Sequence, residues 1–155
     1  MITVNDAMAE QDPLKLDSML CFAVYAAGHA FTRFYKPRLE ALELTYPQYL
    51  VFLVLWEHDD LTVKALGDRL FLDSGTITPL VKRLEARGLL KRQRDTVDER
   101  QVRIKLTEEG RALRGRALAV PLAVGDALGG NAEAGAAMRQ GLQALRQRLD
   151  EAMGP

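Results

Sequence analysis

The spacing of the apolar residues changes just after Gly88, and that change limits the folds open to this chain. Before Gly88, apolar residues recur every three or four positions, as they do on amphipathic helices. Two short runs follow, LLKRQR and QVRIKL, and in the second Val102, Ile104 and Leu106 alternate with basic residues. The alternation predicts a half-buried strand, and the charged segment DTVDER between the runs predicts the tip of a hairpin.

Helical periodicity and capping residues predict the remaining elements. The expected helices run from Leu14 to about Tyr35, from Thr45, from Thr62 to Phe71, from Asp73 or Ser74 to Gly88, over residues 107–128, and from about Ala134 to Met153. Pro37 should break or kink the first of these helices. Pro79 lies inside the helix expected to end at Gly88. It predicts either a first turn that tolerates the missing N–H donor or a true helix start nearer Thr78.

The second helix carries the strongest burial signal. Thr45 and Gln48 have the spacing of a capping box, and Pro47 suits a first turn. The run YLVFLVLW, Tyr49 to Trp56, is apolar on nearly every side, which is typical of a helix at the centre of a domain.

This order of elements predicts a fold that is mainly α with a small β-hairpin wing (α+β). We expect one chain over residues 1–155, with a winged helix-turn-helix core at 45–106. The flanking segments, 14–44 and 107–153, have wide apolar faces and no sheet to cover them. We therefore expect them to be dimerisation helices in a homodimer.

The charge distribution favours a nucleic-acid partner, although the total of 21 basic and 21 acidic residues cancels. Residues 1–60 carry a net charge of −5, residues 61–116 carry +6, and residues 117–155 carry −1. A basic middle of this kind is what a nucleic-acid footprint produces, although a solvated basic surface without a partner would look the same.

The segment DSGTITPLVKRLEARG has the composition of a DNA recognition helix. It begins with small hydroxyl residues, continues with basic ones, and carries Leu80, Val81 and Leu84 on the side expected to face the core. The candidate DNA contacts here are Ser74, Thr76, Thr78, Lys82 and Arg83. An ordinary amphipathic helix whose hydroxyls serve as caps is the alternative.

The hairpin adds candidates of its own. Arg94 and Arg100 could contact the DNA backbone or enter a narrow minor groove, whose negative potential attracts arginine. Asp98 lies two residues before Arg100 and could hold its guanidinium by paired hydrogen bonds. A mixed-charge solvated turn is the alternative.

Cys21 is the only cysteine, so an intrachain disulfide and a four-cysteine zinc site are excluded. If Asp17 caps the first helix, the thiol lies near the positive end of the helix dipole, which favours a thiolate. A thiolate reacts with peroxide to give a sulfenic acid. A small side chain packed among apolar neighbours is the alternative.

Residues 44–110 resemble the MarR family of bacterial winged-helix repressors, most specifically in the ending DERQVRIKLTEEG. The segments DSGTITPLVKRLE and LTYPQYL further resemble the branch that senses organic hydroperoxides. In that branch, tyrosines lie fourteen and twenty-five residues after the sensing cysteine, the spacing of Tyr35 and Tyr46 from Cys21. Tyr25 matches another aromatic residue of the sensing pocket.

The resemblance implies a homodimer on double-stranded DNA with an inverted-repeat operator. It implies that an organic hydroperoxide oxidises Cys21 and that the repressor then leaves its operator. Arg100 would be the wing-tip arginine and Asp98 its anchor. Some members of the branch carry a second cysteine, whereas Ala127 and its neighbours include none, so this chain resembles the one-cysteine type. A small cellular thiol, a backbone nitrogen or over-oxidation would then consume the sulfenate.

Rival functions remain open at this point. A MarR-type repressor could release DNA on binding a phenolic or other small ligand, with Cys21 merely packed. A thiol peroxidase would need an activating base, and the two histidines, His29 and His58, lie in no catalytic motif. An interaction module that never touches DNA fits the basic middle poorly.

Other classes are excluded by what the sequence lacks. It contains no metal-ligand spacing and no glycine-rich phosphate loop, so we expect no cofactor, no metal and no enzyme activity. The longest apolar run has eight residues, where a membrane span needs about 18, and the N-terminal segment is acidic. We therefore expect a cytoplasmic protein without membrane contact.

Overall fold

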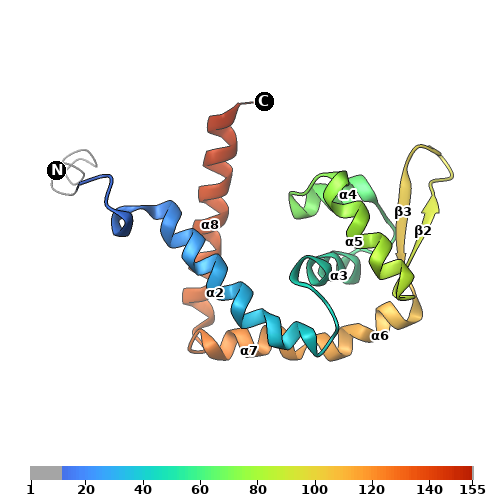
Figure 1. Ribbon diagram of the computed structural model, residues 1–155, viewed down its shortest axis with the longest axis horizontal. Coiled ribbons are helices and arrows are strands. Elements are labelled where there is room, and N and C mark those ends of the chain that lie inside the picture. The colour runs from blue at the N-terminus through green and yellow to red at the C-terminus, as the bar shows by residue number, and fades with distance from the viewer. Residues whose placement is uncertain (1–11, 155) are drawn as a thin grey trace. The chain divides into compact units, whose positions relative to one another are not determined.

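The computed structural model describes residues 12–154 (Figure 1). The chain forms two compact units, and the division between them falls inside one helix, after Ala112. The first unit contains η1 (Leu16–Ser18), α2 (Leu20–Glu40), α3 (Tyr46–Glu57), β1 (Leu61–Thr62), α4 (Val63–Leu70), α5 (Ser74–Ala86), β2 (Leu90–Arg94), β3 (Val102–Leu106) and the start of α6 (Glu108–Ala117). The second unit contains the rest of α6, α7 (Ala119–Ala127) and α8 (Ala132–Met153).

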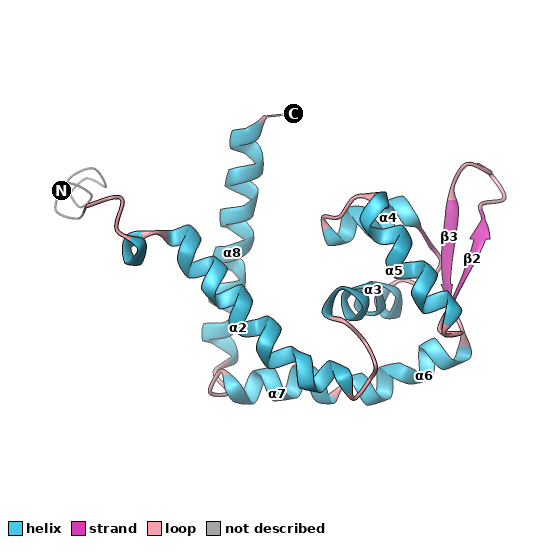
Figure 2. Cartoon of the chain, in the orientation of Figure 1, coloured by secondary structure: helices cyan, strands magenta, loops and turns pink. Residues whose placement is uncertain are grey.

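A small antiparallel sheet accompanies the helices and confirms the predicted fold class (Figure 2). The predicted hairpin is β2 paired with β3, from Leu90 opposite Leu106 to Arg94 opposite Val102. A third strand, β1, was not predicted, and it pairs with the other side of β3. Strand β1 is only two residues long, too short to show an alternating pattern. The carboxylate of Asp59, just before it, accepts the Leu106 backbone N–H at 2.9 Å and so ties this segment to the end of β3.

Helix α3 is the central element of the first unit, as predicted. The Thr45 hydroxyl accepts the Gln48 N–H, and the Gln48 side chain accepts the Thr45 N–H, so the capping box is complete. The buried residues of α3 include Val51, Phe52 and Leu55. They are covered by α4 and α5, which contribute the fully buried side chains Leu66, Ile77, Val81 and Leu84.

The turn between α4 and α5 requires a close backbone approach. Helix α4 is capped as expected, by the Thr62 hydroxyl on the Ala65 N–H at 3.0 Å. It ends at Phe71, whose φ of 56° is left-handed. A Cβ at Gly67 would collide with the carbonyl oxygen of Leu72, so only glycine fits there. The result is the tight turn of a helix-turn-helix.

Helix α5 corrects two expectations about the recognition segment. It begins at Ser74, and Pro79 lies well inside it, not in a first turn and not near a later start. Proline removes the bond to the carbonyl one turn back, but packing of α5 on the core outweighs that loss. The core-facing residues are Ile77, Val81 and Leu84, while Leu80 is only half-buried. Gly88 follows the helix with a φ of 73° and provides the predicted stop.

Helix α2 begins and ends later than predicted. Met19 is extended, with φ −86° and ψ 114°, and it separates α2 from the preceding 3-10 turn. Asp17 and Ser18 lie in that turn. Aspartate and serine favour turns over helix interiors, so this location suits them. The helix continues past Pro37 to Glu40. The Arg38 guanidinium donates to the Phe34 carbonyl at 2.7 Å, an added contact within the turn that holds the proline.

The helix predicted over residues 107–128 is two helices. Helix α6 ends at Ala117, and α7 resumes at Ala119. Pro121 explains the break, because its ring clashes with the carbonyl four residues back, which belongs to Ala117. Helix α8 is capped by the Asn131 side chain, which accepts the Ala134 N–H at 3.0 Å.

Candidate nucleic-acid interface and redox site

The start of α5 presents hydroxyl groups, one of which already has a structural role. The Asp73 carboxylate accepts the Thr76 N–H at 2.8 Å and the Thr76 hydroxyl at 3.2 Å. These bonds to Thr76 hold the pKa of Asp73 below its usual range. The Thr76 side chain is therefore part of the cap, while the Ser74 side chain is exposed at the first helical position.

A groove of about 230 Å³ joins α5 to the wing. It brings together three predicted DNA contacts, Ser74, Thr78 and Arg100, and sequence reasoning missed Lys64, which also lines it. The whole lining is Thr62, Val63, Lys64, Ser74, Thr78, Arg100, Gln101 and Val102. Lys82, Arg83 and Arg94 are exposed, but they lie outside this lining, as does Thr76. The DNA contacts themselves stay predictions.

The wing arginine is held as expected. The Arg100 Nε and Nη2 atoms donate to the two carboxylate oxygens of Asp98 at 3.0 and 3.2 Å. The pKa of Asp98 is lowered, chiefly by this contact with Arg100. The Arg100 side chain is nevertheless 90% exposed, so its charge is fixed in direction and open to a ligand.

A second acidic residue shapes the wing, and sequence reasoning did not single it out. Asp95 is buried and accepts the N–H groups of Val97 and Asp98 at 2.7 and 3.1 Å. Its other oxygen accepts from Arg103 at 3.0 Å, and Arg103 also donates to Asp60 at 2.7 Å. An aspartate followed by turn residues in DTVD is an Asx-turn pattern, so this signal was present in the sequence.

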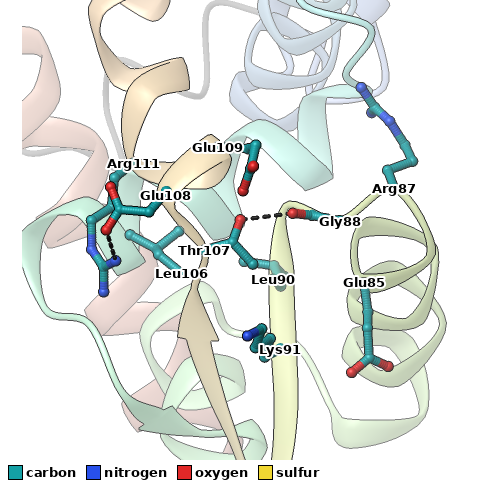
Figure 3. Close-up of a pocket in the computed structure, with 10 residues that line it drawn as sticks. All are labelled: Glu85, Arg87, Gly88, Leu90, Lys91, Leu106, Thr107, Glu108, Glu109 and Arg111. Atoms are coloured by element: carbon teal, nitrogen blue, oxygen red, sulfur yellow. Dashed lines mark hydrogen bonds and ion pairs between the residues drawn. The ribbon is translucent and has the colours of Figure 1, made fainter.

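A pocket larger than this groove lies beside the start of β2, and none of the predicted site residues line it (Figure 3). Acidic and basic side chains both line it, among them Glu85, Lys91 and Glu108. At its edge the Thr107 hydroxyl donates to the Gly88 carbonyl at 2.7 Å. The mixture of charges gives no preference for one class of ligand.

Cys21 is exposed and is the second residue of α2. The expectation that Asp17 caps this helix is wrong, because Met19 occupies the cap position and no side chain caps the helix there. The thiol is therefore in the first turn, closer to the positive end of the dipole than predicted. Tyr25 lies one turn on, with its ring 6.4 Å from Phe22 and 4.3 Å from His29.

Tyr35 and Tyr46 belong to a separate aromatic cluster. Their ring centroids are 5.0 Å apart, and Tyr49, which sequence reasoning did not single out, lies 6.0 Å from Tyr35 and 6.5 Å from Tyr46. Burial raises the pKa of all three hydroxyls, and the neighbouring tyrosines raise those of Tyr35 and Tyr49 further. The hydroxyls therefore stay protonated at neutral pH and can donate hydrogen bonds.

Within one chain, the structure does not bring Cys21 to this cluster. Cys21 and Tyr35 lie on the same helix, fourteen residues apart. At 1.5 Å per residue they are about 21 Å apart along the axis, and the interval of about four turns puts them on similar faces.

Within residues 12–154, no group of three or more His, Cys, Asp or Glu side chains is arranged to hold a metal ion. No helix in that range is long and apolar enough to cross a membrane.

Comparison with known proteins gives consistent matches. The family model described as transcriptional regulator SarA/Rot matches residues 33–115. The chain is 52% identical to the HTH-type transcriptional regulator TtmR of Methylorubrum extorquens, over 98% of this chain and 78% of that protein. It is 47% identical to the organic hydroperoxide resistance transcriptional regulator of Bacillus subtilis, over 90% of this chain and 92% of that protein. The solved structure of reduced AbfR bound to DNA matches with a TM-score of 0.74 and 34% identity, over 94% of this chain and all of that one.

The fold and the exposed, anchored wing arginine are those of a winged helix-turn-helix transcriptional regulator. Helices α4 and α5 form the helix-turn-helix, and strands β2 and β3 form the wing beside it (Figure 1). With the relatives above, the chain belongs to the MarR and SarA family of transcriptional regulators, in the branch that includes the organic hydroperoxide resistance regulators.

Proposed function

We propose that this protein is a homodimeric repressor that senses organic hydroperoxides through Cys21. The reduced dimer binds an inverted-repeat operator, and oxidation of Cys21 releases it. The observation that carries the proposal is that an exposed thiol, Cys21, and a protonated tyrosine hydroxyl, that of Tyr35, lie on similar faces of one helix, about 21 Å apart along its axis. Since its target is chromosomal DNA, we expect it to act in the cytoplasm.

Cys21 and Tyr35 are too far apart to touch within one chain, but a second copy of the chain can bring a tyrosine hydroxyl to the thiol. In a two-fold dimer, residue i of one subunit meets residue j of the other, and j meets i. Two α2 helices that cross antiparallel would set Cys21 against Tyr35 of the partner subunit, twice. Exposed apolar side chains on α2 support such an interface, among them Leu20 at 63%, Phe31 at 41% and Val24 at 39%.

The tyrosine hydroxyls would donate hydrogen bonds to the Cys21 thiolate and stabilise its charge. The thiolate attacks the outer peroxide oxygen, so an S–O bond forms and the O–O bond breaks. Sulfur loses two electrons, and the peroxide leaves as an alkoxide that takes a proton to become an alcohol. The sulfenic acid is larger than the thiolate and bonds differently, so the tyrosine contacts are lost. A small cellular thiol then condenses with the sulfenate and releases water.

The DNA contact would combine two elements. Ser74, Thr78, Lys82 and Arg83 at α5 are proposed for the major groove and its phosphates, with Thr76 as part of the cap. Arg100, held by Asp98, is proposed for the minor groove, and Arg94 for the adjacent backbone. The groove that Ser74 shares with Arg100 supports one continuous surface.

The test is operator binding by the full-length protein, measured by fluorescence anisotropy on its own upstream DNA. Wild type and Cys21→Ser are titrated with cumene hydroperoxide, and Cys21 oxidation is followed by mass spectrometry. We expect both reduced proteins to bind and only wild type to release. Release that also occurs in Cys21→Ser, or binding indifferent to peroxide in both proteins, would overturn the sensor and leave a repressor with another effector. Repeated turnover of peroxide with a thiol reductant and without DNA binding would indicate a thiol peroxidase instead.

A further inference from the structure

The turn between α2 and α3 lies between the two tyrosines of the proposed sensor. Tyr35 lies on α2, and Tyr46 is the first residue of α3. The turn is tightly bonded, because the N–H groups of Leu42 and Leu44 both donate to the Leu39 carbonyl, at 2.9 and 3.0 Å. Both leucines are also buried. We therefore expect a displacement of either tyrosine to be transmitted to this turn.

Glu43 is an exposed residue of that turn, and it is bonded to Arg87 at the end of α5. Its φ is 54°, a left-handed value that is uncommon outside glycine. The Arg87 guanidinium donates through Nη1 to the Glu43 carbonyl, and its Nη2 lies 3.6 Å from a Glu43 carboxylate oxygen. Arg87 caps the C-terminal end of α5, and Figure 3 shows its side chain extending toward an adjacent loop.

The same end of α5 is also fastened to the wing. The Glu85 carboxylate accepts the Arg92 N–H at 2.8 Å and the Arg92 Nε at 2.7 Å. The pKa of Glu85 is lowered, first by the backbone N–H of Arg92 and then by its side chain. Arg92 is in β2, so a movement at this end of α5 reaches both DNA-contacting elements.

We propose that Arg87 is a positioning residue that couples the tyrosine cluster to the recognition helix. When the tyrosines lose their contacts to Cys21, the Glu43 turn shifts and Arg87 pulls the end of α5 with it. The wing follows through Glu85 and Arg92, and the half-site spacing of the dimer changes. This inference rests on the proposed peroxide sensor and adds the path by which it acts.

The geometry also predicts which group in the contact between Arg87 and Glu43 carries the coupling. The principal acceptor is the Glu43 backbone carbonyl, which no side-chain substitution removes. The Glu43 carboxylate is 85% exposed, whereas the Arg87 side chain is 34% exposed. A solvated ion pair contributes little. Glu43→Gln should therefore behave as wild type, and Arg87 should carry the effect.

The variants are Arg87→Met, which keeps the length of the side chain without its donors, and Arg87→Lys, which keeps one donor group. Arg69→Met is the matched control, because it removes one charge from an exposed pair with Glu57. Each full-length protein is tested for operator affinity before and after oxidation, for the rate of Cys21 oxidation, and for its urea unfolding midpoint.

We expect Arg87→Met to oxidise Cys21 at the wild-type rate and to bind operator like Arg69→Met when reduced. Its loss of affinity on oxidation should be about tenfold smaller than in wild type, within the usual range of allosteric coupling. Arg87→Lys should be intermediate. An oxidised-to-reduced affinity ratio equal to wild type in both Arg87 variants would refute the coupling and leave the sensor intact. If Arg87→Met does not fold, the Arg87→Lys ratio decides. A wild-type protein that does not release on oxidation would refute the proposed function, and this inference with it.

Discussion

The Arg100 guanidinium is fixed by two parallel hydrogen bonds to Asp98, at 3.0 and 3.2 Å, while its side chain remains 90% exposed. An exposed arginine normally samples many rotamers, and fixing it in advance reduces the entropy lost on binding. A fixed and solvated guanidinium at a wing tip suits insertion into a narrow, negatively charged minor groove.

Removal of this side chain should weaken operator binding without weakening the fold. We expect Arg100→Ala to lose about tenfold or more in affinity, which is typical for an arginine that reads a groove. Asp98→Ala should lose less, because the charge remains and only its orientation is lost. Anisotropy on operator DNA and a thermal melt of each variant provide the check. An operator affinity of Arg100→Ala equal to that of wild type would contradict the assignment of Arg100 as a DNA contact.

The tyrosine hydroxyls should govern the speed of oxidation rather than DNA affinity. Tyr35→Phe and Tyr46→Phe keep the rings, whose centroids are 5.0 Å apart, and remove only the donors. Loss of a hydrogen bond to a charged group costs about 1.5–3 kcal/mol, so we expect sulfenate formation to slow by about tenfold or more. Tyr49→Phe is the matched control, because this ring belongs to the same cluster and is 3% exposed.

The measurement is the rate of Cys21 oxidation by cumene hydroperoxide, from quenched samples analysed by mass spectrometry. Operator affinity of the reduced variants should match wild type. Oxidation at the wild-type rate in both Tyr35→Phe and Tyr46→Phe would show that these hydroxyls do not reach the thiol.

Local signals in the sequence located most of the DNA-binding core. The capping box of Thr45 and Gln48 gave the start of α3, and Gly88 gave the end of α5. Both signals depend on a few neighbouring residues, which is why they can be read without the fold. The paired bonds of Asp98 and Arg100 are equally local, two residues apart.

What could not be predicted depends on contacts between distant parts of the chain. Strand β1 exists because β3 offers it a free edge, and its two residues carry no pattern of their own. The contact of Arg87 with Glu43 spans 44 residues and uses a backbone carbonyl, which every residue has. The break before α7 is different, because Pro121 was visible in the sequence and the steric rule for proline places the break at Ala117.

The wing network should make the fold sensitive to acid. The pKa of Asp60 is lowered chiefly by its hydrogen bond from Arg103, that of Asp95 by the N–H of Asp98, and that of Glu85 by the N–H of Arg92. A carboxylate with a lowered pKa in the folded state stabilises the fold above its unfolded-state pKa, which is about 4. That stability is lost as the pH falls through the folded-state pKa.

We therefore expect the free energy of unfolding to fall on acidification below about pH 4, as measured by urea titration at several pH values. Glu85→Gln should be less stable than wild type at pH 7 and should approach it at the lowest pH, where the wild-type carboxyl is protonated. Glu99→Gln, at an exposed position in the wing, is the control and should follow wild type throughout. If the free energies of unfolding of Glu85→Gln and wild type differ by the same amount at every pH, the Glu85 carboxylate does not contribute to the acid sensitivity.

Thr107 connects the wing to α6 through one hydroxyl group, and its loss should lower stability. The hydroxyl accepts the Gly110 N–H at 3.1 Å and donates to the Gly88 carbonyl at 2.7 Å. Thr107→Val keeps the shape and removes both bonds, and loss of such a helix cap costs about 1 kcal/mol. For a domain of this size that corresponds to a fall in Tm of about 2–4 °C. Thr107→Ser retains the hydroxyl and should melt close to wild type at the same protein concentration. If the valine variant melts at the wild-type temperature while the serine variant does not, packing of the threonine methyl group, rather than its hydroxyl, holds this junction.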